Sequence, residues 1–212
     1  MKRDFPPFYL ALILVVGCIL FRLLMANPHL AELFPNVSPL LAVAFIGAMY
    51  LPRRWGWALV PVTLVITELG FLRVNSLTDG SGTLFSSWTV LALAAYVALY
   101  AAISGFGIWI AKARSLPWVI GGSLLCSLLF YVAANTLSWG YDAVTGLNPG
   151  YAPTFAGWVQ ANTVGLPGFM PTWLFLRNGM AGDLFFGMIL LFVLDRDLLL
   201  GRSSVRTAAR MA

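Results

Sequence analysis

The sequence predicts an all-α membrane protein in which six helices cross the bilayer and residues 1–212 form a single membrane domain. The first observation is composition, because 60% of the residues are hydrophobic and 10% are charged, whereas soluble domains carry about 25% charged residues. The second is that the apolar residues gather into runs, and a crossing helix needs about 20 such residues. The third is that basic residues occur in alternate connections, as in proteins that cross a membrane several times.

Six apolar segments follow one another along the chain. The first comes after Met-Lys-Arg-Asp and lacks a small-residue cleavage site, so a removed signal peptide is not expected. The second is short for a full crossing at about 1.5 Å per residue, and we expect residues 33–37 to extend it or neighbouring helices to shield it. The predicted segments are 7–25, 38–51, 55–73, 88–111, 117–138 and 172–194.

The basic residues indicate which side of the membrane each connection faces. Ten of the 13 Lys and Arg residues lie before the first segment or after the second, fourth and sixth. The other connections, 26–37, 74–87 and 139–171, contain no Lys or Arg. Because basic residues concentrate in cytoplasmic connections, both termini are predicted to be cytoplasmic. The ten residues are Lys2, Arg3, Arg53, Arg54, Lys112, Arg114, Arg196, Arg202, Arg206 and Arg210.

The longest connection, 139–171, lies on the side without basic residues. Connections of this length without structure are uncommon unless they act as lids or binding loops. Its aromatic residues fit two interpretations. They could form an aromatic belt at the membrane interface, or they could cap a ligand, with Trp139, Tyr151 and Trp158 stacking on a flat molecule.

The sixth segment carries polar residues in its first half, namely Arg177, Asn178 and Asp183. Ionisable groups inside a membrane are expensive, and they usually face a partner or a wet cavity. Arg177 and Asp183 lie about 9 Å apart along a helix and on different faces, so each is expected to find a partner on another helix. Glycines on the same segment would let a neighbouring backbone approach closely. These are Gly179, Gly182 and Gly187.

Two further arginines, Arg22 and Arg73, lie near the outer ends of the first and third segments, where positive charge is otherwise absent. Glu68 precedes Arg73 by between about one and two helical turns. One interpretation is that the arginines extend to the outer headgroups and pair with the acids. The other is that these charges belong to a pocket, in which Glu68 is the expected partner of Arg177.

The sequence contains no recognisable catalytic motif. A glycine-rich phosphate loop, paired cysteine ligands, HExxH and GxSxG are absent, and Cys18 and Cys126 lie in apolar segments, where small core residues are expected. His29, the only histidine, could ligate a metal, haem or corrinoid, although a lone loop histidine is usually an ordinary polar residue. We therefore expect no enzyme activity, cofactor or metal. The alternating charges account for the net charge of +5 without nucleic acid.

Two blocks of the sequence carry recognisable patterns. In the first, an Arg and a Pro-His precede Asn-x-Ser-Pro, a small-residue helix, a basic turn and a helix that ends in an acid. The second begins with Asn-x-x-x-Trp and Tyr-x-x-Thr-x-x-Gly-x-x-Gln. It ends with a Pro, then an Arg-Asn pair and then a Gly-Asp pair. The residues are Arg22, Pro28, His29, Asn36, Ser38, Pro39, Arg53, Arg54, Glu68, Asn135, Trp139, Tyr151, Thr154, Gly157, Gln160, Pro167, Arg177, Asn178, Gly182 and Asp183.

These blocks resemble an uncharacterised bacterial membrane-protein family that is related to the substrate-binding S components of energy-coupling-factor (ECF) vitamin transporters. The resemblance implies an inner-membrane protein with six helices and cytoplasmic termini. It also implies an outward-facing pocket built from the last three helices and roofed by the outer loops. The expected substrate-binding residues are Arg177 and Asn178 for a polar or anionic group, Asp183 and Glu68 for charge, and Asn135, Trp139, Tyr151, Trp158, His29 and Asn36.

The expected function is capture of a vitamin-like or cofactor-like small molecule at the outer face and its passage inward through the lipid bilayer. The protein would work alone or with an ECF-type transmembrane subunit and its ATPases. S components dock through a small-xxx-small surface on the first helix, where this chain offers only Ala11 and Val15. The alternative is a non-catalytic structural subunit of a larger membrane complex, in which the aromatic connection is an interface and the charges pair.

Overall fold

The computed structural model describes residues 7–78, 87–113, 115–146 and 150–200. The all-α prediction is confirmed for these residues, which form helices and no strand. The side chain of Arg73, the whole of Arg114 and the basic residues near both termini lie outside this description. The elements are α1 Pro7–Met25, α2 Pro28–Leu33, α3 Leu40–Ala42, the π-helix η1 Val43–Gly47, α4 Ala48–Tyr50, α5 Arg53–Thr78, α6 Ser87–Ile110, the 3-10 helix η2 Ala111–Ala113, α7 Leu116–Thr145, α8 Phe155–Ala161, α9 Thr172–Leu194 and α10 Arg196–Leu199.

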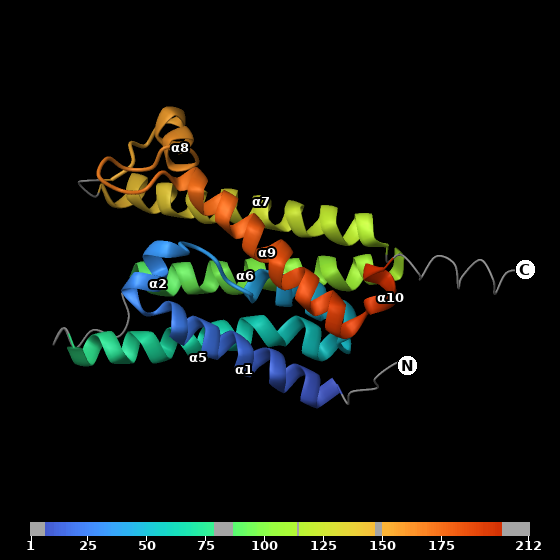
Figure 1. The fold of residues 1–212 in the computed structure, drawn as a ribbon. Coiled ribbons are helices and arrows are strands. Elements are labelled where there is room, and N and C mark those ends of the chain that lie inside the picture. The colour runs from blue at the N-terminus through green and yellow to red at the C-terminus, as the bar shows by residue number, and fades with distance from the viewer. Residues whose placement is uncertain (1–6, 79–86, 114, 147–149, 201–212) are drawn as a thin grey trace, which may run out of the picture.

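Four of the described helices are long and apolar enough to cross a membrane, and they are α1, α6, α7 and α9. They coincide with the first, fourth, fifth and sixth predicted segments. The third predicted segment lies in α5, which is 26 residues long. These helices lie side by side, and both described ends of the chain are at one end of the bundle (Figure 1). We call this the terminal end, and the opposite end, where α2 and α8 lie, the loop end.

The second predicted segment, 38–51, forms only a short helix. Its pieces α3, η1 and α4 are 3, 5 and 3 residues long, so this central helix, Leu40–Tyr50, rises about 16 Å and cannot cross a bilayer by itself. It is apolar on all sides, and residues 40–49 are buried. A helix that is hydrophobic all round belongs in a core, and here the neighbouring long helices supply that core.

Residues 34–39, which we call the connector, complete the path of this segment across the bundle. At the loop end, Asn36 Nδ2 donates to the carbonyl oxygen of Phe175 over 3.2 Å. At the terminal end, the Tyr50 hydroxyl contacts Asp195 Oδ2 at 3.2 Å. The connector and the central helix together therefore run beside α9 from Phe175 to Asp195. The segment therefore passes from one end of the bundle to the other, and its connector part is not helical.

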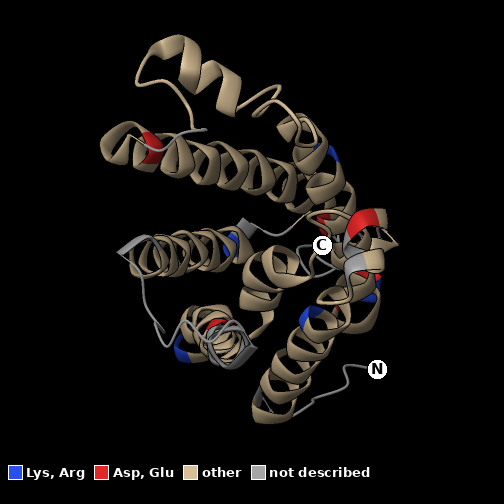
Figure 2. Ribbon diagram, turned by 90° about the vertical axis from the view of Figure 1, so that its left-hand side faces the viewer, with Lys and Arg blue, Asp and Glu red and all other residues tan. Residues whose placement is uncertain are grey.

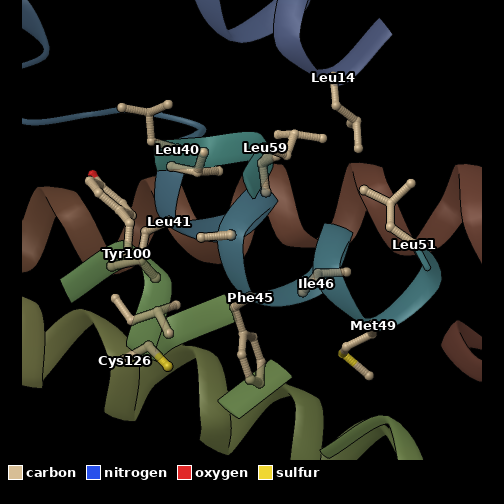
Figure 3. Packing of buried hydrophobic residues seen from close by; sticks show 14 of the residues in the cluster. Leu14, Leu40, Leu41, Phe45, Ile46, Met49, Leu51, Leu59, Tyr100 and Cys126 are labelled. Carbon is tan, nitrogen blue, oxygen red and sulfur yellow. The ribbon is translucent and has the colours of Figure 1, made fainter. Parts of the chain in front are cut away.

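The long helices surround the central helix, as the view from the loop end shows (Figure 2). Glycine permits the closest of these contacts. A methyl group on Gly107 of α6 would lie 2.1 Å from the carbonyl oxygen of Phe45, and one on Gly122 of α7 would lie 2.6 Å from the Phe45 ring. Phe45 points from the central helix toward α7 in the packed core (Figure 3). These glycines therefore let the central helix approach α6 and α7.

The predicted loop 139–171 is partly helical, which corrects its description as one long connection. Helix α7 continues to Thr145 and ends at Gly146, which has a φ of 64° and donates its backbone N–H to the carbonyl of Asp142. Glycine takes this left-handed conformation at little cost. Helix α8 follows after Thr154, whose side chain accepts the N–H of Gly157. We call the described residues 150–171 the α8 loop.

Candidate functional site

The connector enters the bundle between α1 and α9, and two asparagines attach it to α9. Asn36 donates to Phe175, as described above, and Asn178 Nδ2 donates to the carbonyl oxygen of Pro35 over 3.2 Å. Asn36 has a φ of 62°, a left-handed conformation that Asn accepts more readily than most residues. Two of the residues expected from the sequence, Asn36 and Asn178, are thus brought together by reciprocal side chain to backbone hydrogen bonds.

The glycines of α9 give the connector room. A methyl group on Gly179 would lie 3.4 Å from Asn36 Nδ2, and one on Gly182 would lie 3.2 Å from a methyl of Val37. Gly187 faces Ile46 of the central helix in the same way, at 2.8 Å. The predicted close approach of a neighbouring backbone is confirmed at Gly182, where the Cα of Val37 would lie 3.6 Å from the methyl group, whereas Gly179 and Gly187 face side chains. The neighbour is the second segment of the chain.

A pocket of about 400 Å³ lies at the loop end between α1 and the connector. Arg22 is the charged residue among those that line it, and Asn36 and Ser38 provide further polar groups. The remaining lining residues are Phe21, Met25, Ala26, Phe34 and Val37. Ligand sites in proteins typically have volumes of about 300–1,000 Å³, mostly apolar walls and a few polar groups. The pocket fits that description.

Arg22 forms an ion pair with Glu68 of α5, in which Arg22 Nη2 donates to Glu68 Oε1. The two side chains are 20% and 34% exposed, so the pair lies partly inside the bundle. The expected partner of Glu68 was Arg177, and that expectation is wrong. Helix α1 packs along α5, and this long-range contact brings Glu68 to Arg22.

Arg177 lies on the exposed side of α9 and is not among the pocket-lining residues. Its Nε and Nη2 both donate to Asn178 Oδ1 over 3.1 Å. Its guanidinium carbon lies 5.8 Å from the centre of the Trp173 ring. Arg177 therefore orients the Asn178 amide so that its N–H faces Pro35. In this structure it supports the connector from outside, away from the place where it was expected to hold a ligand.

Asp183 is buried at the middle of α9, with 5% of its surface exposed. Its Oδ2 lies 2.6 Å from Ser127 Oγ of α7. The Tyr100 hydroxyl and the Cys126 thiol are near enough to interact with it electrostatically. Within the described residues Asp183 takes part in no ion pair. Asp183 does not line the pocket between α1 and the connector, and its predicted role was to set the charge of a pocket between the last three helices.

The two tryptophans of the expected aromatic cap hold the α8 loop on α7. Trp139 Nε1 donates to the carbonyl of Ala152, and Trp158 Nε1 donates to Thr136 Oγ1, both over 2.9 Å. Phe155 stacks on Trp158, with ring centroids 5.6 Å apart. Neither tryptophan lines the described pocket, which is built on α1 and the connector. This arrangement differs from the expected pocket between the last three helices.

Tyr151 and Asn135 belong to the same α7 surface. The backbone N–H of Tyr151 donates to Asp142 Oδ2 over 3.1 Å, and burial, then Asp142 and Tyr131, raise the pKa of the Tyr151 phenol above its ordinary value. Asn135 Nδ2 donates to the carbonyl of Tyr131 in its own helix. The Tyr131 hydroxyl in turn donates to the carbonyl of Asn162 over 2.8 Å. The second block of the sequence pattern thus maps onto contacts that order the α8 loop.

His29 lies exposed in α2, and its backbone N–H donates to the Asn27 side chain that caps this helix. Within the described part of the chain, no three His, Cys, Asp or Glu side chains come together as metal ligands. Three residues of interest were not singled out from the sequence as site residues. The sequence pattern gives Arg22 two interpretations and assigns no role to Tyr100 or Ser127. The sequence signal for Ser127 is a hydroxyl group within an otherwise apolar segment, where it can serve as a hydrogen-bond partner for a polar residue of another helix.

Comparison with known proteins identifies one family. Residues 3–196 match a family of unknown function, DUF6580. No curated protein and no solved structure matches the chain.

Proposed function

The chain belongs to the DUF6580 family of unknown function, and we propose that it binds a small molecule within the membrane and takes it up, as an ECF S component does. The observation that carries this proposal is the 400 Å³ pocket with Arg22 in its wall and the Arg22–Glu68 ion pair beside it. An ion pair inside a bundle is expensive to bury. Because Arg22 lines the pocket, the pair also places a charged group where it can contact a bound ligand.

The proposed topology has six crossings in a bacterial inner membrane, with both termini in the cytoplasm. The crossings are α1, the connector with the central helix, α5, α6, α7 and α9. Four described basic residues lie in connections or helix ends at the terminal end, and they are Arg53, Arg54, Lys112 and Arg196. By the positive-inside rule this end faces the cytoplasm. The pocket then opens toward the outer face, where a substrate arrives.

The proposed ligand has an apolar body and at least one polar group. Phe21, Met25 and Phe34 offer apolar contacts to the body. Asn36 and Ser38 offer hydrogen bonds, and the guanidinium of Arg22 favours an acceptor such as a carboxylate or carbonyl. Such chemistry fits a vitamin-like or cofactor-like molecule.

Mass spectrometry of the small molecules that co-purify with the detergent-solubilised protein tests this proposal. Removing only one member of this partly buried pair would leave the other charge without its partner, so single variants confound binding with folding. The double variant Arg22→Gln/Glu68→Gln removes both charges together. We expect it to keep a melting temperature near that of the wild type and to lose the bound molecule.

The matched control is Arg177→Gln, which removes an exposed arginine outside the pocket. It should retain the molecule. If the double variant binds as the wild type does, or if neither protein carries a ligand under any purification condition, the pocket assignment is wrong.

A second function, that of a structural subunit in a larger complex, is favoured by one observation. An open groove of about 940 Å³ lies between α6 and α7. Small residues line it, including Ala95, Ala98 and Ala102 of α6 and Ala133 and Gly140 of α7. Small residues let helices pack closely in membranes. A partner helix of another subunit would fit such a groove.

Filling the groove distinguishes the two functions. The variant Ala98→Trp should leave ligand content unchanged if the protein is a binding protein. If the protein is a structural subunit, this variant should lose partner subunits that native mass spectrometry detects in the wild type. Leu125→Trp, at an exposed position of α7 that does not line the groove, is the control for the added bulk.

A further inference from the structure

The contact between Ser127 and Asp183 has one proton too few if Asp183 is ionised. Ser127 Oγ lies 2.6 Å from Asp183 Oδ2 and 3.0 Å from the carbonyl oxygen of Ser123. A serine hydroxyl has a single O–H to donate. The Ser123 carbonyl and an ionised carboxylate can only accept. One of the two short oxygen contacts would then have no hydrogen atom between its oxygens.

A protonated Asp183 satisfies both contacts. Its carboxylic O–H donates to Ser127 Oγ, and the Ser127 O–H donates to the Ser123 carbonyl one turn earlier in α7. Donation from Ser to the carbonyl four residues before it is a familiar arrangement within helices. A distance of 2.6 Å lies within the range of about 2.5–3.0 Å for O–H···O hydrogen bonds. The three oxygens therefore form a continuous chain of donors and acceptors.

Within the part of the chain that the structure describes, no positive charge pairs with Asp183. On α7 the nearby titratable group is the Cys126 thiol, and on α6 it is the Tyr100 hydroxyl. The central helix presents apolar side chains between Leu40 and Gly47. Arg22, which also acts on Tyr100, is paired with Glu68. An isolated ionised carboxylate in a membrane interior is expensive, whereas a neutral acid with a hydrogen bond is not.

From this geometry we propose that Asp183 is a proton-binding site inside the membrane, at which one bound proton joins α9 to α7 through Ser127. The proton site stands independently of the proposed ligand function. Its position adds a connection to the pocket, because Asp183 follows Gly182, against which Val37 of the pocket wall packs. Release of the proton would place a charge directly behind that wall, and this connection alone rests on the proposed function.

Infrared spectroscopy of the purified protein at neutral pH tests the proton site without any ligand. We expect the carbonyl stretching band of a protonated carboxylic acid in the wild type, with a shift on transfer to D₂O. Asp183→Asn should lose this band. The double variant Arg22→Gln/Glu68→Gln should retain it, because it leaves Asp183 and Ser127 in place. Absence of the band in the wild type, or its survival in Asp183→Asn, overturns the proposal.

Two further measurements guard against a variant that folds poorly. Ser127→Ala keeps the acid but removes its acceptor, so the band should persist and shift in frequency. A band at the wild-type frequency in Ser127→Ala contradicts the assigned hydrogen bond. In addition, the folded wild type should bind one more proton than its unfolded chain, and its unfolding free energy should then fall as pH rises. The melting temperature of the wild type should therefore drop relative to Asp183→Asn as the pH is raised, and parallel curves contradict the proposal.

Discussion

Gly107 shows how much a single missing side chain contributes to this fold. It lies on α6 directly against the backbone of the π-helical part of the central helix, and its would-be methyl group meets the Phe45 carbonyl oxygen. Backbone atoms cannot rotate away as the tip of a side chain can. The position therefore requires glycine for close approach, although glycine weakens a helix by about 1 kcal/mol relative to alanine.

The variant Gly107→Ala should destabilise the protein, because the added methyl group would force α6 away from the central helix. Overpacking of this kind costs about 1–3 kcal/mol, visible as a lower melting temperature in detergent. Gly121→Ala is the matched control, since nothing lies within 4 Å of a methyl group there. It should leave stability unchanged or raise it. Equal effects of the two substitutions would contradict the packing described for Phe45.

At the scale of elements, the α8 loop and the connector are attached to long helices by the same kind of contact, but only the connector lines the pocket. Each is attached to a long helix by side chains that donate to backbone oxygens, such as Trp139 to Ala152 and Asn178 to Pro35. The connector lines the pocket, whereas the tryptophans of the α8 loop do not. The two elements should therefore respond differently to substitution.

For the α8 loop, Trp158→Phe removes the donor to Thr136 and keeps an aromatic ring beside Phe155. Loss of one such hydrogen bond costs about 1 kcal/mol. We expect faster proteolysis of the loop at unchanged ligand content. Thr136→Val removes the same bond from the other side and should behave alike. If Trp158→Phe weakens ligand binding while the protease sensitivity stays the same, the aromatic residues cap a ligand after all.

At the scale of the whole molecule, the arrangement of crossings decides which face the pocket serves. An impermeant thiol reagent added to intact cells should label Thr145→Cys at the loop end and leave Ser203→Cys unlabelled. The two native cysteines, Cys18 and Cys126, are each 2% exposed, so they should react little, and a variant with alanine at both provides the background. Labelling of Ser203→Cys but not Thr145→Cys would reverse the proposed orientation.

Composition and local pattern were sufficient to predict the helical class and the approximate extents of the four helices that can cross a membrane. These features depend on neighbours in sequence, because an apolar run of about 20 residues forms a helix in lipid whatever it packs against. The close approach of a neighbouring backbone at Gly182 was also predictable, because small residues in membrane helices let other backbones come near. The identity of the approaching segment was not.

Only the tertiary structure decided which polar groups meet. Glu68 pairs with Arg22 and not with Arg177, and Asp183 meets Ser127, because the order in which α1, α5, α7 and α9 surround the central helix selects the partners. The sequence places each charge at a depth in the membrane but leaves open which neighbouring helix it faces. A buried charge must find a partner at its own depth, and the packing of glycines against the central helix and connector determines which partner is within reach.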